Sequence, residues 1–93
     1  MIQGFHDRLT EDVYRGRCPK GFPPDLFRRV RAKLGELDAA VQLSDLAAPP
    51  GNGLHALSKD RAGQHAIAVN KQFRLCFVWT PPGPDRVEFT DYH

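Results

Sequence analysis

The sequence predicts an α+β fold, in which a small antiparallel β-sheet carries two N-terminal helices on one of its faces. The first half of the chain contains an apolar stripe with helical spacing, whereas the second half contains three short runs rich in aromatic and β-branched residues. The chain has 93 residues, and neither half alone could bury enough surface to fold stably. We therefore expect residues 1–93 to form a single domain.

The N-terminal half is predicted to supply one short strand and the two helices. MIQGF at 1–5 is the expected strand, and DRLTEDVYRG at 7–16 is the expected first helix, with Leu9 and Val13 on a common face. The second helix is expected over 23–43. Its apolar residues recur at intervals of three or four, which builds one stripe for burial, and they are Leu26, Val30, Leu34, Leu37 and Val41.

The C-terminal half is predicted to supply the sheet. The runs at 64–70, 72–79 and 86–92 alternate in the manner of strands, and TPPGPD between the last two is typical of a hairpin loop. Successive side chains of a strand point to opposite faces. The large side chains of QFRLCFVW should therefore face the helices, while Arg74 faces away.

The same alternation can be followed along the last strand. Val87 and Phe89 have the parity expected of core residues, so Thr90 and Tyr92 should point to the opposite face. This places a permanent cation, Arg74, and a phenol together on the exposed face of the sheet.

The charge distribution is more informative than the net charge. The formal net charge of +2 does not by itself indicate a nucleic-acid-binding protein. However, FRRVRAK at 27–33 places four cations at the start of the second helix. Such a run is most often a solvated helix face. The alternative is a surface that meets RNA phosphates and binds them in a salt-dependent way.

Several classes of protein are disfavoured by the sequence. Polar residues begin by position 6, which leaves no room for a signal peptide, and the longest apolar run, LCFVW, is far shorter than a membrane helix. Cys18 and Cys76 are too few to staple a secreted domain or to build a zinc site, although a single disulfide remains an alternative. We expect a cytoplasmic protein that does not associate with membranes.

The residues that could carry chemistry form a scattered polar set. The four histidines have no metal-ligand spacing, so we expect neither a metal nor a cofactor. RNA cleavage without a metal needs a base for the ribose 2'-hydroxyl, cations for the phosphate and an acid for the leaving 5'-oxygen. Side chains suited to these tasks are His55, Ser58, Lys59, Arg61, Arg74, Asp91, Tyr92 and His93.

The C-terminal third also carries a family resemblance. The segment LHAL, the strand pair containing AIAVNKQFRLCF, and the terminal DYH, in this order and in a chain of this length, resemble the HigB toxins of the RelE-like toxin family. The resemblance implies a ribosome-dependent endoribonuclease that cuts messenger RNA and inhibits translation and growth. It also implies inhibition by a HigA-like antitoxin with a helix-turn-helix fold, in a complex expected to be a heterotetramer on operator DNA.

The resemblance implies a role for individual residues. The histidine of the LHxL segment corresponds to His55, the sheet arginine to Arg74, and the terminal acid, tyrosine and histidine to Asp91, Tyr92 and His93. Contacts to RNA phosphates are expected from the segment after LHxL, at Ser58, Lys59 and Arg61. The division of base and acid work among His55, Tyr92 and His93 stays open.

One departure from the family pattern leaves a rival hypothesis. The family has a lysine directly after LHxL, where this chain has Ser58, with Lys59 one step later. The rival is a toxin-like module that binds its antitoxin or the ribosome without cutting RNA. A DNA-binding regulator is disfavoured because no helix pair with a short turn presents recognition residues.

Overall fold

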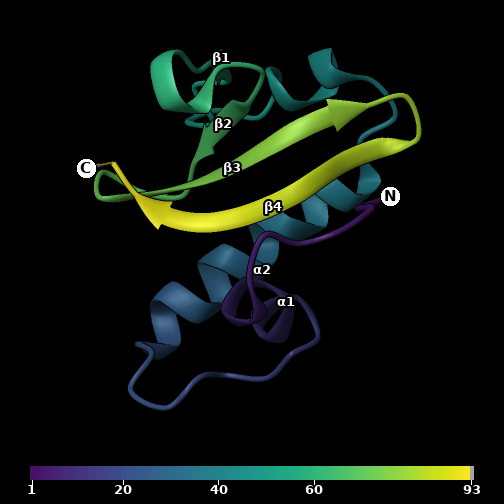
Figure 1. Ribbon diagram of the computed structural model, residues 1–93. Coiled ribbons are helices and arrows are strands. Elements are labelled where there is room, and N and C mark those ends of the chain that lie inside the picture. The colour runs from purple at the N-terminus through teal and green to yellow at the C-terminus, as the bar shows by residue number, and fades with distance from the viewer. Residues whose placement is uncertain (93) are drawn as a thin grey trace.

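The computed structural model describes residues 1–92 and has the predicted α+β architecture (Figure 1). Two helices, α1 (Arg8–Tyr14) and α2 (Pro24–Ala39), pack on one face of a four-stranded antiparallel sheet. The strands lie in the order β1 (His55–Ala56), β2 (His65–Ala68), β3 (Phe73–Thr80) and β4 (Gly83–Asp91). Short 3-10 helices, η1 (Leu43–Leu46) and η2 (Lys59–Arg61), occupy the connections on either side of β1. No helix in the described part of the chain is long and apolar enough to cross a membrane.

The predicted N-terminal strand is reduced to a single bridge beside β4. Phe5 pairs with Val87 in parallel, and hydrogen bonds join the amide of His6 to the carbonyl of Val87 (2.9 Å) and the amide of Val87 to the carbonyl of Gly4 (3.1 Å). Between Cys76 and Val78 the register of β3 with β4 shifts, and Arg86 has a φ of +51°. This bulge bends β4 and interrupts regular pairing along its edge.

Helix α1 lies within the predicted range 7–16 but buries a different pair of residues from the predicted one. Asp7 caps it by accepting the amide N–H of Thr10 at 2.9 Å. Val13 is fully buried, as expected, but Leu9 is 40% exposed and Thr10 is buried in its place. The reason is a tertiary hydrogen bond, since the Thr10 hydroxyl accepts the amide N–H of Phe89 on β4 at 2.9 Å.

Helix α2 confirms most of the predicted stripe. Val30, Leu34 and Leu37 are at most 1% exposed. The helix ends at Ala39, however, and Val41 is 78% exposed, so the expectation that Val41 lies on the stripe is wrong. The cause is local, because the carboxylate of Asp45 accepts the amide N–H groups of Val41 and Gln42, each at 3.0 Å, and turns the chain into η1.

The two faces of the sheet follow the predicted alternation. Leu75, Phe77 and Val87 are fully buried against the helices, and the rings of Phe73 and Phe89 stack beside them with centroids 4.8 Å apart. The hairpin is as tight as its sequence predicts, since Thr80 pairs directly with Gly83. The opposite face, called here the outer face, carries the residues of the other parity.

Candidate active site

The strand register assembles two rows of residues on the outer face. His55, Ala66, Cys76 and Glu88 pair in sequence across all four strands and form the first row. Ala68, Arg74 and Thr90 form the second row, two residues further along. Small side chains therefore flank Arg74 on the β2 side.

Arg74 and Tyr92 are in contact on the outer face, as the alternation predicts. The guanidinium carbon of Arg74 lies 5.2 Å from the centroid of the Tyr92 ring, which is a cation–π distance. The main chain of Tyr92 is fixed by its amide N–H, which donates to the carbonyl of Gln72 at 3.0 Å. The phenol thus lies beside the guanidinium although Tyr92 follows the last residue of β4.

The Nε atom of Arg74 is buried and has no hydrogen-bond partner among the described residues. A buried donor that stays unpaired costs about 1–3 kcal/mol. The Arg74 side chain as a whole is only half-buried, so its fixed positive charge can still attract an anionic oxygen. Arg74 is therefore suited to binding a phosphate group.

His55 presents one ring nitrogen for chemistry. Its Nδ1 lies 2.9 Å from the carbonyl oxygen of Gly53. A carbonyl can only accept, so Nδ1 carries the proton of this hydrogen bond. In the neutral imidazole Nε2 is then unprotonated, and since the side chain of His55 is exposed, this atom is available as a base.

The terminal residues divide between the two faces. Asp91 pairs with Phe73 and has the parity of Phe89, so by strand alternation it does not share the outer face with Arg74 and Tyr92. His93 lies outside the described residues. The structure thus brings together Arg74 and Tyr92 of the predicted set, with His55 on the same face.

Arg61 lies on the outer face but is engaged by the protein itself. Its guanidinium donates to Glu88 at 2.9 and 3.4 Å and to Gln64 at 3.1 Å. The hydrogen bond that Arg61 donates to Glu88 is the main cause of a raised pKa for Arg61. Sequence reasoning offered Arg74 as a possible partner of Glu88 and did not identify Arg61, because Arg61 and Glu88 are 27 positions apart and lie on non-neighbouring segments.

Ser58 and Lys59 lie in the turn that Arg61 holds. Ser58 precedes η2, and Lys59, which is exposed, has a φ of +56°, an uncommon conformation for a residue other than glycine. Two hydrogen bonds close the turn, from the amide of Arg61 to the carbonyl of Ser58 and from the amide of Ala62 to the carbonyl of Lys59, each at 3.1 Å. The cation of this segment that stays accessible is therefore Lys59.

Cys76 lies in the middle of the outer face but is not a nucleophile. It is fully buried, and both cysteines are free. Burial raises the pKa of the Cys76 thiol, and the nearby Arg74 only partly opposes this effect. The thiol therefore stays protonated near neutral pH.

One group of described residues has the spacing of metal ligands. Ligand atoms of His6, Asp7 and Glu88 lie within 4.8 Å of one another. The carboxylate of Glu88 is already paired with Arg61. Glu88, Arg61 and Arg86 line one hollow of about 390 Å³. Two guanidinium groups beside it oppose the binding of a further cation.

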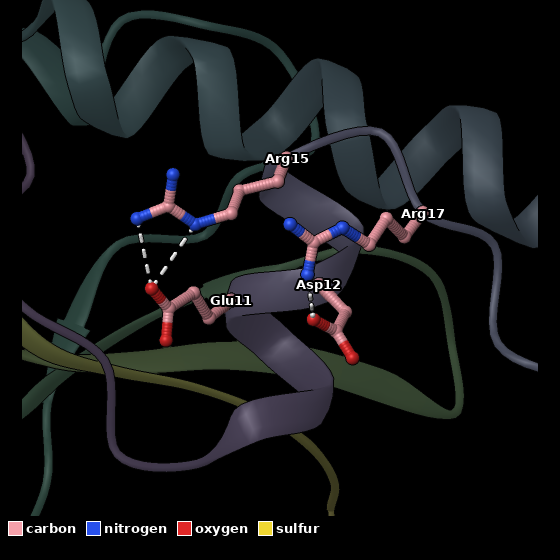
Figure 2. A network of polar contacts seen from close by, with 4 residues as sticks. All are labelled: Glu11, Asp12, Arg15 and Arg17. Atoms are coloured by element: carbon pink, nitrogen blue, oxygen red, sulfur yellow. Dashed lines mark hydrogen bonds and ion pairs between the residues drawn. The ribbon is translucent and has the colours of Figure 1, made fainter.

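Most cations of the N-terminal half are paired within the protein. Figure 2 shows two exposed ion pairs on α1, Arg15 with Glu11 (2.9 Å) and Arg17 with Asp12 (3.2 Å). On α2, Arg28 pairs with Asp25, Arg31 donates to the carbonyl of Tyr14, and Lys33 bonds Asn52 and Glu36. Within the described chain Arg29 is the member of the basic run without such a partner. The predicted basic surface of α2 is thus much smaller than its sequence suggests.

Comparisons with known proteins find relatives that match most of the chain. Residues 3–93 match the model of the HigB-like toxin family, described as the RelE-like toxin of the type II toxin-antitoxin system HigB. Toxin HigB-1 of Vibrio cholerae serotype O1 is 43% identical over 80 residues, which cover 85% of this chain and 84% of that protein. An uncharacterized protein of Haemophilus influenzae is 30% identical over 76 residues, which cover 81% of this chain and 75% of that protein.

Proposed function

This chain belongs to the HigB-like family of RelE-like toxins of type II toxin-antitoxin systems, and we propose that it is a ribosome-dependent endoribonuclease that cleaves messenger RNA without a metal ion. A type II toxin implies an antitoxin as its partner. We further propose that residues 1–93 act as one toxin domain in the cytoplasm. Its antitoxin would be a HigA-like helix-turn-helix protein that forms a heterotetramer with it on operator DNA.

The proposed reaction is an intramolecular displacement at phosphorus. The ribose 2'-hydroxyl loses its proton to a base and attacks the adjacent phosphate, which forms a bond from the 2'-oxygen to phosphorus. The bond from phosphorus to the 5'-oxygen breaks, and an acid protonates that oxygen. The products are a 2',3'-cyclic phosphate and a free 5'-hydroxyl.

The residues of the outer face suit these steps. Arg74, with Lys59, would neutralise the charge that develops on the phosphate oxygens. Nε2 of His55 is oriented to accept or return a proton. At the chain end, Tyr92 and His93 would share binding and proton transfer. Asp91, which has the parity of the opposite face, would orient a neighbouring residue and not contact RNA itself.

The observation that carries the proposal is the contact between Arg74 and Tyr92. A guanidinium is held 5.2 Å from a phenol ring, and its buried Nε has no partner among the described residues. Such a pair offers an anion a fixed charge and, beside it, an aromatic surface on which a base can stack. A purely structural arginine would be expected to pair with a carboxylate, and the suitable one, Glu88, is bound to Arg61.

The binding module without catalysis stays as the second candidate. The observation in its favour is Ser58, at the position where the family resemblance implies a lysine, together with the engagement of Arg61 by Glu88. Both reduce the number of cations that can reach a phosphate. Growth arrest does not separate the two candidates, because a protein that blocks ribosomes also stops translation.

Primer extension on a messenger translated in vitro separates them. We would compare wild type, Arg74→Ala and Arg74→Lys, with and without ribosomes, and use Arg17→Ala as a matched surface-arginine control. We expect ribosome-dependent cuts from wild type and the control, a loss of about 10²-fold or more in Arg74→Ala, and partial recovery in Arg74→Lys. An intact messenger with wild type that still binds ribosomes would establish the binding module instead.

A further inference from the structure

We propose that a groove beside the outer face, lined by Arg29 and Lys71, binds the phosphate backbone of the messenger strand that enters or leaves the cleavage site. This inference rests on the proposed function, because it takes messenger RNA as the occupant of the neighbouring outer face. It adds an RNA-binding subsite formed by α2 and the β2–β3 turn.

The groove lies where the turn between β2 and β3 approaches α2. Its volume is about 760 Å³, and its lining residues are Arg29, Gly51, Ala68, Val69, Asn70, Lys71 and Gln72. This volume lies within the range of pockets that hold small ligands. The groove is therefore large enough for one nucleotide unit of a strand.

The groove is continuous with the outer face through one residue. Ala68 lines the groove and also pairs directly with Arg74 across β2 and β3. Neighbouring strands are about 4.8 Å apart, so the distance from Arg74 to the groove is short on the scale of a nucleotide. A strand whose phosphate is held at Arg74 can continue over Ala68 into the groove.

The charge of the groove favours a polyanion. Arg29 and Lys71 are both exposed, and neither has an ion pair in the part of the chain that the structure describes. Among residues 1–92, no carboxylate side chain lines the groove. The other cations of the basic run are bound to neighbouring groups of the protein. Arg29 and Lys71 are thus two unpaired charges at one site.

The turn that forms the groove is held rigid. The side-chain oxygen of Asn70 accepts the amide N–H groups of Gln72 and Phe73 at 2.8 and 2.7 Å, and the carbonyl of Gln72 accepts the amide N–H of Tyr92 at 3.0 Å. The same turn therefore positions both Lys71 and the main chain of Tyr92. A site held in place in this way loses little conformational entropy when it binds.

Binding to a short RNA tests the groove directly. The probe is a fluorescent single-stranded RNA that carries 2'-O-methyl groups throughout, so that it cannot be cut, and affinity is measured by anisotropy over a series of salt concentrations. The variants are Arg29→Ala, Lys71→Ala and the double variant, with Arg28→Ala as control, because Arg28 is the neighbouring exposed arginine on α2 and does not line the groove. Thermal unfolding and antitoxin binding are recorded for each variant.

Each lost phosphate contact lowers the slope of log K against log salt by about 0.7 for a single strand. We expect the double variant to lose about 1.4 in slope and about tenfold in affinity at physiological salt, with unchanged unfolding, while Arg28→Ala behaves as wild type. Unchanged affinity and slope in the double variant would show that the groove does not bind RNA, even if wild type cuts messenger. A double variant that loses antitoxin binding but keeps RNA binding would overturn it as well, because the groove would then be a protein-binding surface.

Primer extension on translated messenger and ribosome binding, measured with the same variants, separate this inference from the proposed function. If wild type leaves translated messenger intact but binds the probe through Arg29 and Lys71, the RNase proposal is wrong. RNA binding by the groove is then still supported. If wild type cuts messenger and the double variant loses ribosome binding without losing affinity for the probe, the groove contacts ribosomal RNA and the proposed messenger path is overturned.

Discussion

Replacing Arg61 or Glu88 should show that this ion pair is a structural clamp. The pair joins the turn after β1 to β4 across the outer face, with N–O distances of 2.9 and 3.4 Å. The side chains are 30% and 16% exposed, so the pair is partly shielded from water. The sequence alone predicts a different role, in which Arg61 binds RNA phosphate.

The expected contribution of the pair to stability follows from these contacts. A hydrogen bond to a charged group contributes about 1.5–3 kcal/mol, whereas an exposed ion pair contributes about 0.2–1 kcal/mol. For a partly buried pair with one short and one long contact, we expect a coupling energy of about 1.5 kcal/mol in a double-mutant cycle. Arg61→Ala should lower the melting temperature by about 6–12 °C in a domain of this size.

The assay is chemical unfolding of wild type, Arg61→Ala, Glu88→Ala and the double variant, together with RNA binding by the same four proteins. If the pair is a clamp, Arg61→Ala and Glu88→Ala should each reduce stability. A coupling energy below about 0.3 kcal/mol would refute the clamp, since it would equal that of a weak surface pair. An Arg61→Ala variant that keeps the stability of wild type but binds RNA less tightly would also refute it, because Arg61 would then be acting as a phosphate ligand.

Four further outcomes are expected. Asn52→Ala removes three side-chain hydrogen bonds of a fully buried amide and should lower the free energy of unfolding by about 2–4 kcal/mol, measured with denaturant. Backbone hydrogen bonds hold the pKa of Asp45 below its usual value. Its stabilising effect is therefore present above the unfolded-state pKa and lost as pH falls through the folded-state pKa, so the stability of wild type should fall on acidification below the usual carboxyl range more than that of Asp45→Asn, as denaturant unfolding at several pH values would show. Native protein should be alkylated at the exposed Cys18 and not at the buried Cys76 until it unfolds, as mass spectrometry would show. Lys59→Asn keeps a side chain that tolerates positive φ and removes the cation, so cleavage should fall while unfolding stays unchanged; equal cleavage would exclude a role for Lys59.

The features that the sequence predicts well depend on periodicity. Leu34 and Leu37 are buried because they recur at helical intervals, and Arg74 meets Tyr92 because strand alternation carries a side chain to a known face. Both patterns are local and repeat along the chain. An error of one residue in the predicted strand alternation would have assigned every side chain to the wrong face. The agreement of the predicted faces with the structure is therefore informative.

The features that the sequence does not predict depend on single side chains bonding to distant or irregular backbone. Val41 leaves the stripe because the Asp45 carboxylate binds its amide N–H. Leu9 is exposed because Thr10 accepts a hydrogen bond from Phe89, 79 positions away. Periodicity contains no information on such contacts, since they arise only when the elements have been packed together.

The clamp holds the turn in which this chain departs from the family pattern, with Ser58 in place of a lysine. Lys59 has a positive φ, which costs a residue with a Cβ atom about 1–2 kcal/mol and persists only when its surroundings enforce it. The hydrogen bonds of Arg61 to Glu88 and Gln64 enforce it here, because they fix the residue two positions after Lys59. A strained lysine that is held in place and remains exposed, directly after Ser58, is the arrangement expected if position 59 performs the role that the family resemblance gives to position 58. Relaxing the clamp should then weaken cleavage through Lys59, without requiring a contact between Arg61 and RNA.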